Sequence, residues 1–263
     1  QDYLSVIKAA SSAGENKSTK YPATGNSLAD QLKIVARLIS GGLKTPLYYV
    51  NMGGFDTHAN QVDSADTSKG FHATLMERLS TAISAFMDDC SQLKIDDKVA
   101  GMTFSEFGRR IQSNFSLGTD HGAAGPMFVF GNAVNPGIIG NNPTIPSTVT
   151  VKDNLPMEYD FRQIYASVLQ QWFELDDETT DSDVLLRNFD NLPVFATTSS
   201  TRKVLKVEKG LVLEQNYPNP FNPQTIIPIK MKEDNLVTLE VFDNIGRRVA
   251  TIFEGQLSAG SYE

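Results

Sequence analysis

Two short clusters in the first half of the chain each place an aspartate close to a histidine. Asp56 and His58 lie in the segment LYYVNMGGFDTHANQ, and Asp120 and His121 are adjacent in the segment GTDHG. In extended backbone, residues i and i+2 face the same side, so Asp56 and His58 can bind one ion. Asp120 and His121 point apart, which suits either a loop serving two neighbouring ions or one ion together with a supporting contact. All four are therefore candidate metal ligands.

A set of two carboxylates and two imidazoles favours a particular group of cofactors. It predicts a divalent metal ion, first of all zinc, with manganese, iron or calcium as alternatives. The competing interpretation is that both aspartates are turn residues beside surface histidines, since short motifs often match by chance. Position favours the metal site, because both clusters border apolar strands on the side where an open α/β sheet binds its ligands.

Two residues near these clusters are candidates for catalysis. Glu106 follows an apolar segment, and it can act as a further ligand, as a base, or as the ion-pair partner of Arg109 or Arg110. Arg109 can hold a phosphate or sulfate oxygen through its planar guanidinium group. The alternative, an ordinary surface arginine, is favoured for Arg110.

Amphipathic and apolar segments predict the elements that must hold these residues. Apolar residues at three- and four-residue spacing predict helices over 27–39, 69–93 and 160–173. Short apolar runs predict strands over 46–51, 99–104 and 126–130. Strands and helices in this order predict a layered α/β domain over residues 1–195, with a mostly parallel sheet and flanking helices. Asp160 stands at the start of the last helix, where we expect it to act as a cap.

The composition changes after this domain. Residues 196–210, ATTSSTRKVLKVEKG, are rich in threonine, serine and lysine and predict a linker. Beyond it, residues 236–242 and 248–253 alternate between apolar and polar, as strands do. We therefore predict a small all-β module over 211–263, incomplete at its C-terminal end. Because the chain starts at Gln1 rather than at methionine and stops inside an expected hairpin, we expect a fragment cut at both ends.

The composition also argues against several classes of partner. The 263 residues carry a formal net charge of −8, and no cluster of lysine and arginine is longer than a pair. These features disfavour nucleic acid and anionic membrane surfaces. No apolar run approaches the roughly 18 residues of a membrane-spanning helix, so no transmembrane segment is predicted. Cys90 is the single cysteine, which leaves no internal disulfide and no cysteine-based zinc site.

Five segments, in order, carry a resemblance to a known family: GGFDTHANQ, FHATLMERLSTAISAF, GMTFSEFGRRIQSN, GTDHGAAGPMFVFG and DFRQIYASVLQQW. Through them, residues 46–173 resemble the family catalogued as domain of unknown function 1501, which looks like a branch of the alkaline phosphatase and sulfatase superfamily. The resemblance implies one or two metal ions at the C-terminal edge of a central sheet. It implies Asp120 and His121 as one ligand pair, and Asp56 and His58 as upstream ligands at a tighter spacing than the superfamily's usual one. The superfamily's nucleophile lies in a segment that would precede this chain.

The end of the chain carries a second resemblance, through the segments LEQNYPNPFNPQTIIPI, VTLEVFDNIGRRVATI and LSAGSYE. These segments resemble the bacterial sorting tail of type IX secretion, and they are similar to the immunoglobulin-like domain of the flagellar hook cap. The resemblance implies an immunoglobulin-like β-sandwich with the type IX secretion machinery as its partner. It also implies a location outside the bacterial cell, either secreted or on the outer-membrane surface.

Two functions follow as expectations. In the first, the chain belongs to a secreted metal-dependent hydrolase that acts on a small phosphate or sulfate ester, or on a phosphorylated or sulfated polymer. The four clustered residues hold the metal, Arg109 and the metal neutralise the anion, and Glu106 handles a proton. In the second, a non-catalytic secreted or cell-surface protein keeps the same fold and a structural metal, because one scaffold can host both roles.

Overall fold

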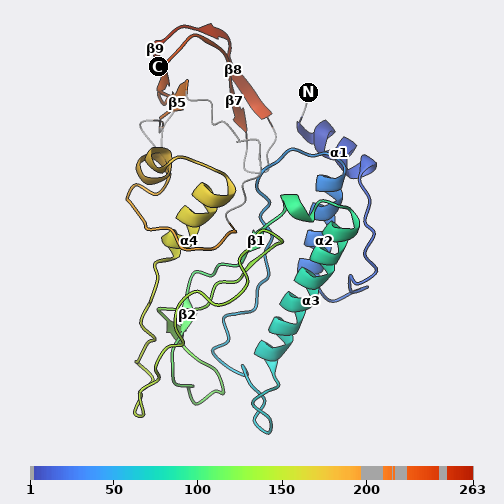
Figure 1. The fold of residues 1–263 in the computed structure, drawn as a ribbon, viewed down its shortest axis with the longest axis vertical. Helices are drawn as coiled ribbons and strands as arrows, with labels where there is room; N and C mark the ends of the chain where they lie inside the picture. The colour runs from blue at the N-terminus through green and yellow to red at the C-terminus, as the bar shows by residue number, and fades with distance from the viewer. Residues whose placement is uncertain (1–2, 197–209, 215, 217–223, 243–247, 263) are drawn as a thin grey trace. The chain divides into compact units, whose positions relative to one another are not determined.

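The computed structural model describes residues 3–196, 210–214, 216, 224–242 and 248–262. They belong to two compact units, Gln1–Thr201 and Arg202–Glu263, which are described separately (Figure 1). Most of the predicted linker, residues 197–209, lies outside the described residues. The fold is mixed α/β: the first unit combines helices with small antiparallel sheets, and the described part of the second consists of strands.

Two amphipathic helices, α2 (Ser27–Ser40) and α3 (Phe71–Gln92), lie side by side and form the main core of the first unit (Figure 1). Their apolar residues recur at helical spacing, so one face of each helix is buried. A further helix, α1 (Tyr3–Ala13), packs on α2. These bounds confirm the helices predicted over 27–39 and 69–93. The buried residues of this core are Leu28, Ala29, Leu32, Val35, Ala36, Ala82, Phe86, Cys90, Ile95 and Val99.

The strands of the first unit are short and pair antiparallel. β1 (Gly101–Met102) pairs with β4 (Val129–Phe130), and β2 (Gly108–Arg109) pairs with β3 (His121–Gly122). The predicted layered, mostly parallel sheet is not seen among the residues that the structure describes. Parallel neighbours need a crossover of about a dozen residues, usually a helix. The chain between β1 and β4 contains only loops and the β2–β3 pair, so it returns in the antiparallel direction.

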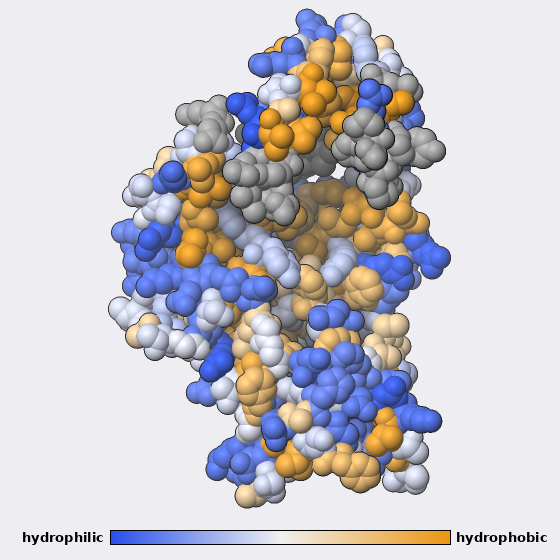
Figure 2. Space-filling view, turned by 180° about the vertical axis from the view of Figure 1, so that it is seen from behind, coloured by the Kyte–Doolittle hydropathy of each residue, from blue (hydrophilic) through white to orange (hydrophobic). Residues whose placement is uncertain are grey.

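The segment 46–51, predicted as a strand, is coil in the structure. Its side chains nevertheless alternate: Tyr48 and Val50 pack on the helical core, whereas Leu47 and Tyr49 are 72% and 76% exposed. This alternation explains why the sequence pattern predicted a strand. Such exposed apolar side chains contribute to the hydrophobic surface, which Figure 2 shows in several separate areas between polar ones on one side of the molecule.

The remainder of the first unit contains shorter elements. They are the 3₁₀ turn η1 (Asp96–Lys98), the helix α4 (Phe161–Ser167), and the π-helical turns η2 (Val168–Trp172) and η3 (Thr179–Val184). The helix predicted over 160–173 is therefore present, and its second half is wound as a π-helix. Trp172 in η2 packs against Phe195, with ring centroids 5.4 Å apart, in a second small core.

Asp160 caps α4, as predicted. Its carboxylate accepts a hydrogen bond from the backbone N–H of Arg162 at 2.9 Å, and the side chain of Gln163 accepts one from the N–H of Asp160 at 3.1 Å. The guanidinium of Arg162 also pairs with the carboxylate at 2.6 Å. The hydrogen bonds from the side chain and backbone of Arg162 lower the pKa of Asp160 to about 2.

Replacing Asp160 with alanine is expected to lower the free energy of unfolding by about 1 kcal/mol at neutral pH, since a capping acceptor is lost. Because the pKa of Asp160 falls from 3.8 to about 2 on folding, its charged form stabilises the protein above about pH 4, and this contribution is lost as the pH falls towards 2. Denaturant unfolding across that range, followed by fluorescence, measures the difference in the free energy of unfolding.

Asp160→Asn is the control, because it keeps the cap without a charge. The contribution of this asparagine to stability should not change with pH. A difference between wild type and Asp160→Ala that stays constant with pH would contradict the expected pH dependence.

The C-terminal unit is all-β in its described part, as predicted. Its strands are β5 (Leu211–Leu213), β6 (Ile229–Met231), β7 (Asn235–Phe242), β8 (Arg248–Leu257) and β9 (Gly260–Tyr262). They form a three-stranded sheet in the order β5-β6-β9 and a separate β7–β8 pair, all antiparallel. The expected immunoglobulin-like sandwich is not evident in these described strands.

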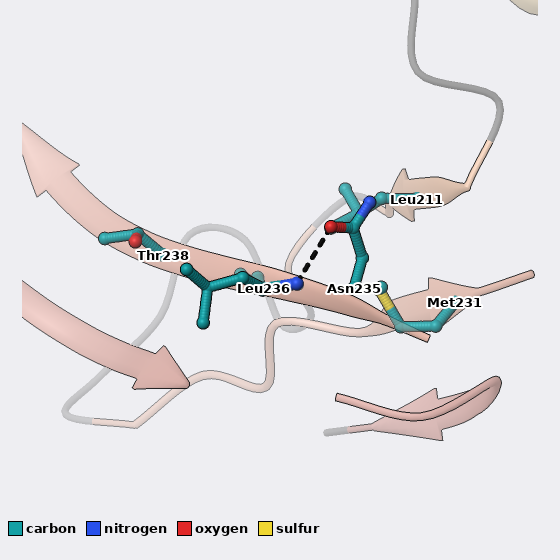
Figure 3. A pocket seen from close by; sticks show the side chains of 6 residues that line it. Leu211, Met231, Asn235, Leu236 and Thr238 are labelled. Atoms are coloured by element: carbon teal, nitrogen blue, oxygen red, sulfur yellow. Dashed lines mark hydrogen bonds between the residues drawn. The ribbon is translucent and has the colours of Figure 1, made fainter. Parts of the chain in front are cut away.

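A small open hollow lies between the strands of this unit (Figure 3). It is lined by Leu211, Met231, Asn235, Leu236, Val237 and Thr238. Within the hollow, the side-chain oxygen of Asn235 accepts a hydrogen bond from the N–H of Leu236. None of these six lining residues is charged. Among the helices that the structure describes, none is long and apolar enough to cross a membrane.

Candidate metal centre

The first half of the site is the loop that follows the extended segment 46–51. The N–H of Thr57 donates to the carbonyl of Phe55 at 2.9 Å, which closes a tight turn centred on Asp56. As a result Asp56 and His58 face each other, with Asp56 Oδ1 3.0 Å from His58 Nε2. Asp56 and His58 therefore lie on the same side of the chain, as their i, i+2 spacing predicted.

The second half of the site is the β2–β3 pair and the loop between its strands. His121 is paired with Arg109 across the two strands, and the N–H of Arg110 donates to the carbonyl of Asp120 at 3.1 Å. A Cβ at Gly118 would lie 2.3 Å from the backbone of His58, so only glycine allows the two loops to come this close.

Three side chains from these loops converge on one point. His121 Nε2 lies 2.8 Å and His58 Nε2 lies 3.0 Å from the same carboxylate oxygen, Asp56 Oδ1. One ligand atom from each residue lies within 4.8 Å of the other two, and all three residues are exposed. Ligand atoms around a tetrahedral zinc ion lie about 3.3 Å apart, and the two distances from Asp56 Oδ1 to the imidazole nitrogens are close to this value. One oxygen and two nitrogens are a donor set that would hold zinc with an open fourth position. The hydrogen bond from His121 is the main cause that holds the pKa of Asp56 below its usual range.

Asp120 occupies a different place from the other three. Its Oδ1 lies 3.2 Å from Nδ1 of His58, the ring nitrogen that faces away from Asp56. It also accepts a hydrogen bond from Nδ2 of Asn114 at 3.2 Å, and these two bonds, that from Asn114 first, hold the pKa of Asp120 below its usual range. A carboxylate on the far nitrogen of a metal-binding histidine fixes the ring orientation. Of the two arrangements that the sequence left open, this geometry corresponds to one ion with a supporting contact.

Arg109 lies between the two halves of the site. Its Nη1 donates to the carbonyl of Thr119 at 2.7 Å, and its Nη2 donates to the carbonyl of Phe55 and contacts Asp56 Oδ1 at 3.2 Å. The guanidinium group therefore ties the loops together and brings positive charge beside Asp56.

Glu106, the other residue expected to be catalytic, is exposed and forms no hydrogen bond or ion pair with the residues that the structure describes. It is therefore not the partner of Arg109 or Arg110, which was one of the alternatives. Arg110 donates instead to the backbone, from Nε to the carbonyl of His121 at 3.1 Å and from Nη1 to the carbonyl of Lys152. It is a structural residue of the second loop rather than an ordinary surface arginine.

Four residues that support the site were not singled out from the sequence: Phe107, Asn114, Gln61 and, in its structural role, Arg110. The ring of Phe107 stacks on the imidazole of His121, with centroids 3.8 Å apart and planes at 12°. Nδ2 of Asn114 donates to the carbonyl of His58 at 2.9 Å as well as to Asp120. Their only signal in the sequence is that they lie within the five quoted segments, because loop residues show no periodicity.

Comparison with known proteins identifies the family. The family model described as "Protein of unknown function (DUF1501)" matches residues 8–187, which is more than half of the chain and includes the whole metal site. No curated protein and no solved structure matches the chain. The chain therefore belongs to the DUF1501 family.

Proposed function

We propose that the chain is the metal-binding part of a secreted, metal-dependent hydrolase acting on phosphate or sulfate esters. The observation that carries the proposal is the convergence of Asp56, His58 and His121 on one point, within reach of solvent. A divalent ion held there supplies Lewis acidity and positive charge towards an ester oxygen. The resemblance of the quoted segments to the alkaline phosphatase and sulfatase superfamily supports phosphate and sulfate esters as the substrate class.

The chain's own residues support this role in different ways. Asp56 and the two histidines bind the ion, and Asp120 orients His58 through its far nitrogen. Arg109 adds positive charge beside Asp56, which favours an anionic substrate at this place. The hydroxyls of Thr57 and Thr119 are buried and donate to a neighbouring side chain, so neither is free to act as a nucleophile.

Export by type IX secretion is the second part of the proposal. It is supported by the tail segments quoted above and by the all-β character of the described C-terminal strands. The immunoglobulin-like arrangement belongs to the same proposal. It places the hydrolase outside the bacterial cell, secreted or on the outer-membrane surface.

A second candidate function is a structural metal site without turnover. Two observations favour it. Both terminal nitrogens of Arg109 already donate to backbone carbonyls, and Glu106 forms no hydrogen bond or ion pair with the described ligands. Arg109 thus lies beside the ligands but is engaged with the backbone, and Glu106 is not bonded to them, so neither residue is arranged for the catalytic role that the sequence predicts.

Metal analysis followed by an ester assay separates these functions. We expect the purified chain to bind one zinc ion, to hydrolyse an aryl phosphate or an aryl sulfate, and to lose that activity with a chelator and regain it with zinc. One bound zinc ion without turnover of either ester would favour the structural role. A chain that binds no divalent ion would contradict both functions.

A further inference from the structure

Gln61 makes contact with both halves of the metal centre through one atom. Its side-chain oxygen accepts a hydrogen bond from the hydroxyl of Thr57 at 2.8 Å and another from the hydroxyl of Thr119 at 2.7 Å. Thr57 lies between the two ligands of the first loop, and Thr119 directly precedes Asp120 and His121. A single side chain therefore joins residues next to the ligands in both loops.

The backbone around Gln61 continues this connection. Its N–H donates to the carbonyl of Leu117 at 2.9 Å, and its carbonyl accepts from the N–H of His72 at 3.0 Å, at the start of α3. The N–H of Thr119 also donates to the carbonyl of Thr57 at 3.2 Å. His72, a histidine outside both clusters, thus takes part in the support of the site through its backbone.

The hydroxyls that Gln61 accepts are shielded from water. Thr57 is 3% exposed and Thr119 is 8% exposed, whereas the side chains of Asp56, His58 and His121 are 48–57% exposed. The three ligand side chains are therefore partly open to solvent, although Phe107 stacks on His121 and Asp120 contacts His58. The hydroxyls of Thr57 and Thr119, in contrast, are buried, and a buried hydroxyl that loses its acceptor cannot bond to water instead. Breaking their hydrogen bonds to Gln61 therefore costs free energy.

From this arrangement we infer that Gln61 is a positioning residue of the metal site, which fixes the spacing between the two ligand-bearing loops. The inference rests on the proposed metal site and assigns no contact between Gln61 and the ion. Metal affinity depends on ligand positions held to a fraction of an ångström by supporting hydrogen bonds. His121 comes from one loop while Asp56 and His58 come from the other, so a change in loop spacing changes the site directly.

The test compares two replacements of similar size at this position. Gln61→Met removes the accepting oxygen, and we expect it to weaken zinc binding by roughly 10- to 100-fold, as for other residues that support metal ligands. Gln61→Glu keeps an accepting oxygen, and we expect its zinc affinity to stay within about threefold of wild type. Competition with a chromophoric chelator, performed on the full chain at a temperature where all variants are folded, gives the dissociation constants.

The threonines provide a second, independent measurement. Thr57→Val and Thr119→Val each remove one donor with little change in shape, and each should weaken zinc binding in the wild-type background. In the Gln61→Met background the same changes should have little further effect, because the shared bonds are already gone. Fully additive effects would overturn the inference.

Gln171 offers a matched control in the same unit. Its side chain also makes two hydrogen bonds, donating to the carbonyl of Leu192 at 2.7 Å and accepting from the N–H of Phe195 at 3.1 Å. Gln171→Met should therefore retain the zinc affinity of wild type. Equal weakening by both methionine variants, or unchanged binding by Gln61→Met, would overturn the role of Gln61 alone. Absence of zinc binding by the wild-type chain would instead refute the proposed metal site.

Discussion

Zinc binding to an Asp56→Ala variant is expected to be weaker than binding to the wild-type chain by about two orders of magnitude or more. Asp56 Oδ1 is the atom that both imidazoles face, at 2.8 Å from His121 and 3.0 Å from His58. Its removal leaves two neutral ligands and takes away the one carboxylate charge at the centre of the site. Competition titration at neutral pH and low ionic strength measures the loss.

Asp66→Ala is the matched control for this experiment. Asp66 is likewise an aspartate in a loop of the same unit, with a side chain 43% exposed, but its carboxylate bonds to Ser68 and Lys69. Its pKa too is held below the usual range, by the hydrogen bond from the Ser68 hydroxyl first. The Asp66 variant should bind zinc as the wild type does. Equal affinity of the Asp56 variant and the wild type would remove Asp56 from the ligand set.

Replacing Asp89 with alanine is expected to lower the free energy of unfolding of the first unit by about 3–5 kcal/mol. Asp89 is fully buried on α3, and its carboxylate accepts hydrogen bonds from the side chain of Asn16 at 2.7 Å and from the N–H groups of Lys17 and Ser18 at 2.6 and 3.0 Å. A fourth bond comes from the hydroxyl of Tyr21 at 3.0 Å. Burial and the adjacent carboxylate raise the pKa of Tyr21, so this hydroxyl stays a donor. The Asp89→Ala variant removes the carboxylate that accepts from these four donors, which all lie in residues 14–26, the connection between α1 and α2.

Urea unfolding followed by the fluorescence of Trp172 measures this change, since Trp172 is the single tryptophan and lies in the first unit. Asp88→Ala is the neighbouring control. Asp88 precedes Asp89 on α3, and its half-buried carboxylate accepts hydrogen bonds from Lys20 at 2.6 Å, from the hydroxyl of Ser18 at 2.6 Å and from the side chain of Gln92 at 2.8 Å. We expect a clearly smaller loss for this variant, because its donors are side chains that can turn to water, whereas Asp89 is fully buried. Similar losses for both would show that burial of Asp89 is not the cause.

The sequence predicted which residues form the candidate site better than it predicted how they are arranged. The i, i+2 spacing of Asp56 and His58 predicted that they face the same side, and the turn centred on Asp56 does bring the two side chains together. The approach of the second cluster depends on long-range contacts such as those of Arg109. The role of Asp120 depends on which ring nitrogen of His58 faces it, and this orientation is set only by the folded environment.

The fold was predictable where local periodicity decides it. α2 and α3 bury one face each, and a helical spacing of apolar residues is visible without any partner. The direction of strand pairing is not local: residues 99–104 and 126–130 have the composition of strands in either orientation. Their antiparallel pairing follows from the connection between them, which contains no helix. A loop has no periodic pattern, so the sequence did not reveal this.

The loops that carry the ligands are far apart along the chain. His58 and Asp120 are separated by 62 residues, and Asp56 and His121 by 65. An ion held by both loops is therefore a reversible cross-link that closes a long loop. A disulfide across such a span would stabilise a protein by about 4 kcal/mol through the entropy of the unfolded chain. These 263 residues contain one cysteine and so cannot form a disulfide among themselves. A bound ion would therefore supply the kind of cross-link that disulfides supply in many small secreted domains.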